Sequence, residues 1–502
     1  MRKKAAVLSY IILIVNMLYS ICVTPFVIRA LGQGEYGVYT LCTSLISYLS
    51  LFQFGFSTTF LRYYIKYDSE GKKQKAEELN GMFLIIFSII SGVVLLVGSI
   101  LVLNVRTVFG SKITSEEYEI AKSLLSLVVI NVVISTLGVP FQALLTAYER
   151  FVFQKTLALI EMVFKTVGLI LLLLAGYKSV AIVLVNTFLS ILIFLCNIAF
   201  VFKKLRIRFR FTNFDKSLFR EMSGFSFFVF LQSIMDMFNW QIDKFLLARF
   251  WGSNEVAVYS VGAQFNQILI SLVGSITSLY VPMANRLVAE KRGNKELSAL
   301  MIRLGRLQFM IVTFIFSAFV FFGKPFITEI FAGKSYENAY YVAIFLMAPL
   351  IIPLSMEIWF HIARAQAKHK TSTTVFALVA LLNLLISIPL CRRYAEIGSA
   401  VGTCIGMFIA NNAFQVWYAQ HVLHLDMKLW GKNLLRICPA LIIPCFVGIS
   451  IMLWGNIESI WGFILWAVFY TIITALSFWL FAMNDEEKDM IRVPLSRFAK
   501  HA

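Results

Sequence analysis

The stretch RALGQGEYGVYT, residues 29–40, ends the first long apolar run and returns 220 residues later as RFWGSNEVAVYS, residues 249–260. Both copies keep Arg, Gly, Glu, Val and Tyr at the same five offsets. A chance match is the alternative, since corners that combine glycine, glutamate and an aromatic residue are common at membrane interfaces. We interpret the stretch as one corner that occurs twice, which predicts a chain made of two similar halves.

The composition is that of a membrane protein. The chain has 502 residues, of which 59% are hydrophobic and 14% charged, and its mean hydropathy is +0.79. Apolar runs of about 20 residues, the length that crosses a bilayer as a helix, recur along the whole chain. We therefore expect an all-α polytopic membrane protein with about 14 transmembrane helices.

The positive charges predict the orientation. The formal net charge is +18, which in a soluble protein would suggest nucleic-acid binding. If the N-terminus is inside, about 33 of the 45 Lys and Arg residues lie at inner ends and loops and about 10 at outer ones. The charge thus follows the positive-inside rule. We expect a multi-pass protein of the cytoplasmic membrane with both termini cytoplasmic and no nucleic-acid partner.

The repeated corner sets the domain organisation. Its copies fall at the outer ends of the first and seventh spans, so both have the same orientation, as in a parallel internal repeat. We expect two parallel six-helix lobes followed by two C-terminal helices. The predicted segments are an N-lobe 1–204, a basic cytoplasmic linker 205–222, a C-lobe 223–425, the last two helices 426–485 and a cytoplasmic tail 486–502. The linker either lies on the anionic inner leaflet or is an ordinary basic loop.

No motif for a cofactor is found. The seven cysteines lie in or beside apolar spans without paired spacing, so free thiols are expected, and the His421/His424 spacing lacks the carboxylates of a metal site. No phosphate-binding G-x-x-x-x-G-K-[ST] loop is present. We therefore expect no cofactor and no metal, and coupling to H+ or Na+, to the membrane potential or to consumption of the product.

Five stretches carry a family resemblance. They are PFVIRALGQGEYGVYT from Pro25, FGFSTTFLRYY from Phe54, VPFQALLTAYERF from Val139, WQIDKFLLARFWGSNEVAVYS from Trp240 and PLCRRYAEIGSAVGTCIG from Pro389. In this order they resemble the polysaccharide transporter family, the O-antigen and capsule flippases of the multidrug/oligosaccharidyl-lipid/polysaccharide exporter superfamily. Each stretch consists of small and apolar residues and is not specific by itself, so the resemblance depends on their order. Together the stretches extend over most of the first twelve spans.

The resemblance implies a function in transport. It implies two six-helix lobes around a central cavity and alternating access that carries a polyprenyl-diphosphate-linked oligosaccharide from the cytoplasmic to the outer leaflet. The partners implied are this lipid-linked oligosaccharide, membrane lipids, and a polysaccharide polymerase with other assembly proteins. We expect a monomer.

A polar stripe marks the seventh span. Gln232, Asp236, Asn239 and Asp243 follow the spacing i, i+4, i+7, i+11 and share one helix face. If the stripe lines the cavity, Asp236 and Asp243 are candidates for ion coupling, and Gln232, Asn239 and the repeat-related Asn16 for its polar lining. The alternative is a polar contact between helices.

Two lysines lie within predicted spans. Lys244 follows Asp243 but points about 100° away from it on a helix, and a cation here could bind a diphosphate or extend to the interface. Lys165 is a second candidate for the diphosphate. Glu161, one turn before it, is either a candidate for ion coupling or the partner that neutralises Lys165.

Three arginines end predicted spans. Arg29 and Arg249 are the arginines of the repeated corner, where they either compensate a helix dipole or receive a diphosphate at the outer leaflet. Arg62 lies at the cytoplasmic end of the second span, where a lipid diphosphate would enter. Near the inner end of the tenth span, Glu357 and His361 are spaced i, i+4 and are expected to pair with each other rather than to couple ions.

The rival functions differ in what they require. A membrane polysaccharide polymerase or ligase usually needs a large outer loop, whereas the longest one expected here, residues 104–118, has only about 15 residues. We therefore expect no enzyme. A drug or cation antiporter of the same superfamily stays open, since it would also use an acidic seventh span.

Overall fold

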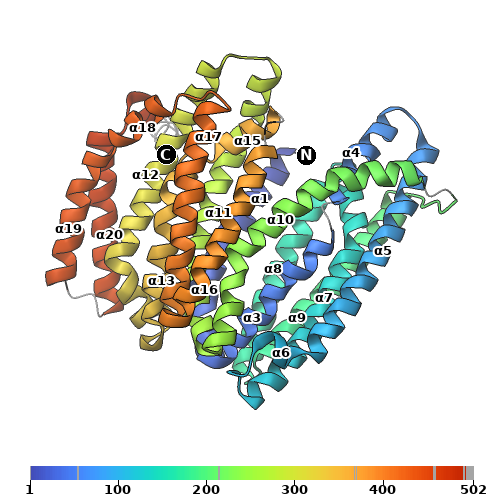
Figure 1. The fold of residues 1–502 in the computed structure, drawn as a ribbon, viewed down its shortest axis with the longest axis horizontal. Coiled ribbons are helices and arrows are strands. Elements are labelled where there is room, and N and C mark those ends of the chain that lie inside the picture. Colours follow the sequence, from blue (N-terminus) through green and yellow to red (C-terminus); the bar gives the residue numbers. More distant parts are fainter. Residues whose placement is uncertain are drawn as a thin grey trace, which may run out of the picture. The chain divides into compact units, whose positions relative to one another are not determined.

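The computed structural model describes residues 2–53, 56–212, 215–366, 368, 370–455, 459–489 and 492. Every regular element in these ranges is a helix, which confirms the all-α class (Figure 1). By their contacts the residues form two units, Met1–Ala257 and Val258–Ala502. The seventh long helix, α10, thus belongs to the first unit by its contacts. The expected division into lobes at residues 205–222 stays a prediction.

In the described residues of the first unit, there are ten α-helices and the start of an eleventh. They are α1 (Arg2–Leu18), α2 (Thr24–Leu31), α3 (Gln33–Ser50), α4 (Phe56–Ser69), α5 (Lys73–Leu103), α6 (Val105–Phe109), α7 (Ser115–Ala147), α8 (Phe151–Leu174), α9 (Ser179–Ala199), α10 (Lys216–Phe250) and α11 (Ser253–Ala289). A π-helical turn, Tyr19–Val23, joins α1 to α2, and another, Phe200–Lys204, extends α9.

Helix α7 is the centre of the first unit. It packs against α3, α5 and α9, which lie around it in Figure 1. Aromatic rings fill the core beside it: the centroids of Phe60 and Phe83 are 4.2 Å apart, and both side chains are fully buried. Such offset pairs contribute beyond their buried area.

The second unit continues α11, and the part of it that the structure describes adds nine α-helices. They are α12 (Asn294–Pro325), α13 (Asn338–Met347), α14 (Ile351–Leu354), α15 (Ile358–Ala365), α16 (Lys370–Met407), α17 (Gln415–His421), α18 (Met427–Leu435), α19 (Ile442–Trp454) and α20 (Ile460–Ser477). The π-helical segments Phe326–Phe331, Phe408–Phe414 and Phe478–Ala482 extend α12, α16 and α20.

Two features organise the second unit. Helix α16 turns sharply at Ala395, where φ is 49°, so its two halves run in different directions. Helix α12 packs against α14, α18 and α19, and α19 pairs with α20 at the edge of the unit (Figure 1). The break in α16 falls between the expected eleventh and twelfth spans.

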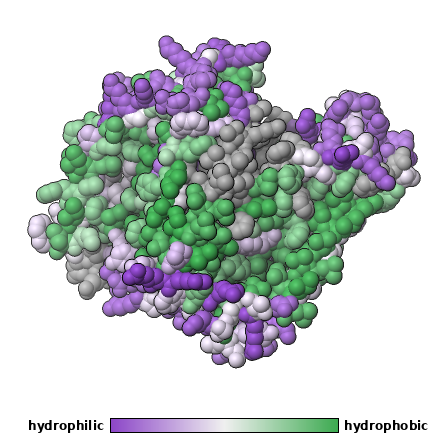
Figure 2. All heavy atoms as spheres, in the orientation of Figure 1, coloured by the Kyte–Doolittle hydropathy of each residue, from purple (hydrophilic) through white to green (hydrophobic). Residues whose placement is uncertain are grey.

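The surface confirms a membrane protein. Large apolar side chains point outward along the helices, for example Leu103 at 74% exposure and Trp454 at 83%. Figure 2 shows hydrophobic residues over the middle of the helices of each unit and hydrophilic residues at the helix ends. Among the described residues, 11 helices are long and apolar enough to cross a membrane. The expected number of about 14 is not confirmed by this criterion, which counts Leu381–His421 once although α16 turns at Ala395.

The basic linker lies along the start of α5. The N–H of Arg210 donates to the carbonyl of Glu77 at 3.0 Å, and the amide of Asn80 donates to the carbonyl of Arg208 at 3.2 Å. The backbones approach so closely that a Cβ on Gly81 would come 2.0 Å from the Arg210 carbonyl oxygen. The linker therefore lies in a defined place on the first unit, with its arginine side chains exposed.

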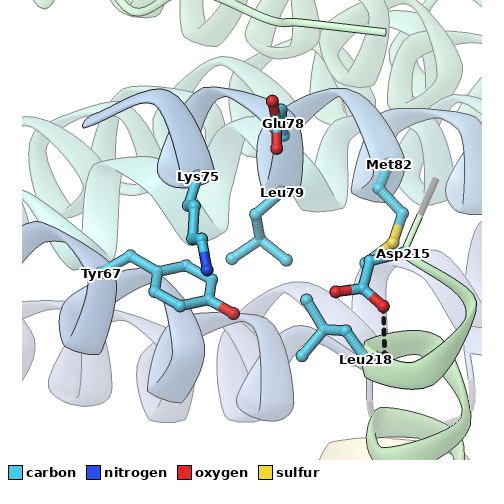
Figure 3. A pocket seen from close by; sticks show the side chains of 7 residues that line it. All are labelled: Tyr67, Lys75, Glu78, Leu79, Met82, Asp215 and Leu218. Atoms are coloured by element: carbon cyan, nitrogen blue, oxygen red, sulfur yellow. Dashed lines mark hydrogen bonds between the residues drawn. The ribbon is translucent and has the colours of Figure 1, made fainter. Parts of the chain in front are cut away.

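Helix α10 begins at Lys216, before the expected residue 223, because Asp215 caps it. The Asp215 carboxylate accepts hydrogen bonds from the N–H groups of Ser217 and Leu218, both at 3.0 Å. This end of α10 faces α4 and α5 across a small pocket of about 60 Å³, in which Lys75 points toward Tyr67 (Figure 3). The pocket is large enough for water but not for a sugar.

Removing this cap tests how α10 starts. The hydrogen bonds from the Ser217 hydroxyl and the Leu218 N–H lower the pKa of Asp215, so the ionised form stabilises the fold. At neutral pH, Asp215→Ala is expected to lower the free energy of unfolding by about 1 kcal/mol, and Asp215→Asn by a few tenths. Because the pKa is lowered on folding, the advantage of wild type over Asp215→Asn should disappear as the pH falls below about 4. An advantage that persists in acid would contradict this explanation.

Candidate functional site

Both copies of the repeated corner form a turn between two helices. Helix α2 ends at Leu31, Gly32 has φ of 75°, and α3 begins at the next residue. Helix α10 ends at Phe250, Gly252 has φ of 119°, and α11 begins at Ser253. Both corners therefore turn on a glycine in the left-handed region, where other residues are strained. The need for a positive φ just before the second helix of each corner explains why the glycine recurs.

The two copies contact each other within the first unit. The amide of Gln33 donates to the carbonyl of Asn254 at 3.4 Å. The backbones come so close that a Cβ on Gly37 would lie 1.9 Å from the carbonyl oxygen of Ser253. The start of α3 is thus packed directly against the start of α11.

Hydrogen bonds to Glu117 stabilise this contact. One carboxylate oxygen accepts from the N–H and hydroxyl of Thr114 at 2.9 and 3.0 Å, which completes a capping box at the start of α7. The other oxygen accepts a short hydrogen bond from the hydroxyl of Ser253. We did not predict this residue, although the Thr-x-x-Glu spacing of residues 114–117 is a recognisable signal for the cap.

Glu35 of the first corner has a comparable role. Its side chain is buried and accepts from the N–H and hydroxyl of Ser179 at 2.9 and 2.5 Å, and Lys178 lies 3.4 Å away. A carboxylate at this position satisfies a free N–H at the start of α9 and is favoured by the helix dipole. The first corner is thereby joined to α9.

The two lysines within predicted spans lie on separate helices. Lys165 of α8 and Lys244 of α10 are both partly buried. In the part of the chain that the structure describes, neither makes an ion pair within 4 Å. Glu161 and Lys165 influence each other electrostatically without such a pair. The proposed role of both lysines as ligands of a diphosphate stays a prediction.

The polar stripe of α10 is described at its last member only. Asp243 is fully buried and lies near Tyr48 of α3, whose ring meets Phe245 edge-on with centroids 5.1 Å apart. Asp243 thus faces protein, which favours its interpretation as a contact between helices. The backbone of α10 is helical through Gln232, Asp236 and Asn239, but their side chains are outside the described part of the structure.

The remaining candidates are exposed. Arg29 ends α2, Arg62 lies in the middle of α4, and Asn16 lies in the second half of α1. Arg249, near the end of α10, packs with its backbone against the turn at Gly110. The structure does not bring these four residues together by any hydrogen bond that it describes, and their proposed roles stay predictions.

A buried ion pair was not expected from the sequence. Arg306 of α12 meets Glu487 through two hydrogen bonds of 2.7 and 3.0 Å, and both side chains are more than nine-tenths buried. The same guanidinium donates to the carbonyls of Ala482 and Asn433 at 2.6 and 3.2 Å. The pair joins α12 to the residues that follow α20.

Known sequences resemble the chain over different lengths. A family model described as "Polysaccharide biosynthesis protein" matches residues 1–288. A putative O-antigen transporter of Shigella flexneri is 21% identical over 76% of this chain and 90% of its own length. An uncharacterized membrane protein of Methanocaldococcus jannaschii, MJ1068, is 26% identical over 42% of this chain, and the match spans only 41% of that protein.

Solved structures share the fold over almost the whole chain. The lipid II flippase MurJ in an inward closed conformation superposes with a TM-score of 0.76 at 16% identity, covering 98% of this chain and 99% of that one. The MATE transporter VcmN of Vibrio cholerae gives a TM-score of 0.56 at 16% identity, covering 85% of this chain and 98% of that one. At this identity the likeness shows the fold alone. Because the family model covers more than half of the chain, the chain belongs to the polysaccharide biosynthesis protein family.

Proposed function

We propose that the chain flips polyprenyl-diphosphate-linked oligosaccharide units from the cytoplasmic to the outer leaflet of the cell membrane by alternating access. The observation that carries the proposal is a fold shared over 98% of the chain with a lipid II flippase, in a member of a polysaccharide biosynthesis family. In this proposal the protein transports its cargo without changing a covalent bond. It acts as a monomer, with both termini cytoplasmic, and delivers its product to a polymerase.

The described residues suit the two parts of such a cargo. Lys165 and Lys244 offer ammonium groups without an ion-pair partner among the described residues, as an anionic diphosphate requires. In the second unit, an apolar pocket of about 250 Å³ lies between α12 and α20 and is lined by aromatic residues such as Phe319, Phe322 and Phe463. Such a pocket can accept hydrocarbon.

Exposure of a lipid-linked sugar tests the proposal directly. Proteoliposomes are loaded with a polyprenyl-diphosphate oligosaccharide, and a membrane-impermeant sugar-cleaving enzyme reports the fraction that reaches the outer leaflet over time. The expected result is faster exposure with the protein than in empty vesicles. Equal rates would contradict the proposed function.

Neutralising the intramembrane lysines should slow the exposure of this cargo. Lys165→Gln and Lys244→Gln are each expected to lower the initial rate about tenfold, since a hydrogen bond to a charged group contributes about 1.5 kcal/mol or more. Lys122→Gln, which removes an exposed lysine of α7, is the matched control and should keep the wild-type rate. Equal rates in all three variants would exclude both lysines from binding the diphosphate.

A drug or cation antiporter is the second candidate. The observation that favours it is the fold likeness to MATE transporters, one of which is described as a multidrug resistance transporter. The same proteoliposomes, loaded with a cationic dye, separate the two functions. Dye export without exposure of the lipid-linked sugar would favour the antiporter.

A further inference from the structure

A broken helix places a carboxylate inside the second unit. Helix α14 ends at Leu354 and α15 begins at Ile358, with the turn 355–357 between them. Pro353, which lacks an N–H donor, contributes to the break. Glu357 is the last residue of this turn, and its neighbours Met356 and Ile358 are fully buried.

The carboxylate of Glu357 is hydrogen-bonded by two other helices. Its Oε2 accepts from the hydroxyl of Thr277 on α11 at 2.6 Å, and that hydroxyl accepts from the side-chain amide of Gln308 on α12 at 2.7 Å. Thr277 and Gln308 are 1% and 0% exposed. Thr277 lies 12 residues before the end of α11, so these groups are about 18 Å from that helix end.

The expected pair with His361 is not formed. No ion pair within 4 Å joins Glu357 to His361 in the described residues, although they are one turn apart. The groups that act on the carboxylate from packed helices are the neutral Thr277 and, behind it, Gln308. No charged group among the described residues acts on it. The spacing i, i+4 was therefore a wrong guide here, because the turn directs Glu357 toward α11.

The Thr277 hydroxyl can serve both protonation states of this acid. It has one proton and two acceptors, Glu357 Oε2 at 2.6 Å and the carbonyl of Val273 at 3.1 Å. When Glu357 is ionised, Thr277 donates to it. When Glu357 is protonated, its O–H donates to Thr277, which turns its own proton to Val273 while it still accepts from Gln308. In both protonation states, the hydrogen bonds that link Gln308, Thr277 and Glu357 are therefore kept.

A second observation is that two oxygen atoms of this group have no hydrogen bond in the described structure. The side-chain amide of Gln308 donates to Thr277 through its nitrogen, and its oxygen, Oε1, is buried without a hydrogen bond in the described structure. Glu357 Oε1 faces Gly274, where an added Cβ would lie 3.7 Å away. Glu357 is half-buried, and in the described residues only its Oε2 accepts a hydrogen bond, so its Oε1 is available to take up a proton.

From this geometry we propose that Glu357, just after the span-length segment Lys334–Leu354, binds and releases a proton and couples the transport cycle to a proton gradient. The coupling rests on the proposed function, whereas the protonation itself does not. A proton needs one acceptor, which Glu357 supplies. A metal cation is usually held by several charged or imidazole ligands, and no group of three or more His, Cys, Asp or Glu residues is found in the described part of the chain.

Infrared spectroscopy of the full chain in lipid nanodiscs tests the protonation. A carbonyl band of a buried carboxylic acid should appear and disappear reversibly as the pH is changed. It should be lost in Glu357→Gln, which keeps an oxygen for Thr277, and change frequency in Thr277→Val. Glu290→Gln, which removes an exposed carboxylate just after α11, is the matched control. A titrating band that survives in Glu357→Gln overturns the proposal.

Flipping under imposed gradients tests the coupling. For wild type, one pH unit across the membrane can change the rate of sugar exposure up to about tenfold. The ratio of rates with and without the gradient should fall to about one in Glu357→Gln and be partly restored in Glu357→Asp. A wild-type rate that responds to Na+ but not to pH, or a Glu357→Gln variant that keeps its pH response, overturns the coupling. If wild type exposes no sugar at all, the proposed function fails, and the infrared titration still decides whether Glu357 binds a proton.

Discussion

Replacing Arg306 with alanine, or Glu487 with glutamine, is expected to lower the free energy of unfolding by about 3–5 kcal/mol. The guanidinium and the carboxylate are both buried, at 7% and 5% side-chain exposure, and two hydrogen bonds join them. Removing either partner leaves the other as a buried, uncompensated charge. The loss should appear as a lower midpoint of chemical unfolding in detergent micelles.

A neighbouring pair provides the matched control. Arg303 lies 3.7 Å from Glu486, and these side chains are 50% and 72% exposed. Arg303→Ala should therefore cost less than about 1 kcal/mol. The double variant Arg306→Met with Glu487→Met should be more stable than either single loss, because two apolar side chains need no partner. Single losses no larger than that of Arg303→Ala would contradict the assignment of the pair as a buried one.

Adding one methyl group at Gly37 should separate the two copies of the corner. Its Cβ would meet the carbonyl oxygen of Ser253 at 1.9 Å, and this obstacle is backbone, which cannot rotate away. Overpacking of this kind costs about 1–3 kcal/mol. Gly37→Ala should therefore shift the protein about 5- to 150-fold toward conformations in which the start of α3 and the start of α11 are apart.

Labelling of Asn254→Cys by a membrane-impermeant maleimide measures this shift. The exposed native cysteines, Cys22 and Cys438, are first replaced with serine. The labelling rate should rise when Gly37→Ala is added. Gly92→Ala in α5, where an added Cβ meets nothing within 4 Å, should leave it unchanged. An unchanged rate in Gly37→Ala would mean that the contact of the two corners does not oppose their separation.

Local patterns predicted the helices well. Apolar runs indicated the long helices, and the positions of Gly32 and Gly252 marked corners in which the structure gives both glycines a positive φ. Two details of the helices were not predicted. Helix α10 starts earlier than expected because Asp215 caps it, and the count of spans depends on a turn at Ala395 that composition does not reveal.

The candidate site was predicted less well, because partners are distant in the chain. Glu357 was assigned to His361 four residues away, whereas its hydrogen bond goes to Thr277, 80 residues away. Asp243 shares a predicted stripe with Asp236, but whether a stripe faces water or protein depends on the neighbouring helix. For Asp243 that neighbour is α3.

The sequence by itself determined the membrane class, the all-helical fold and the repeated corner, because bilayer thickness and helix periodicity act over 20 residues or fewer. Only the tertiary structure decided that the two corners touch, that Arg306 pairs with Glu487 across 181 residues, and that Glu357 is hydrogen-bonded by α11. The physical reason is that a buried polar group must find its partner wherever packing places one, and packing joins residues without regard to their distance along the chain.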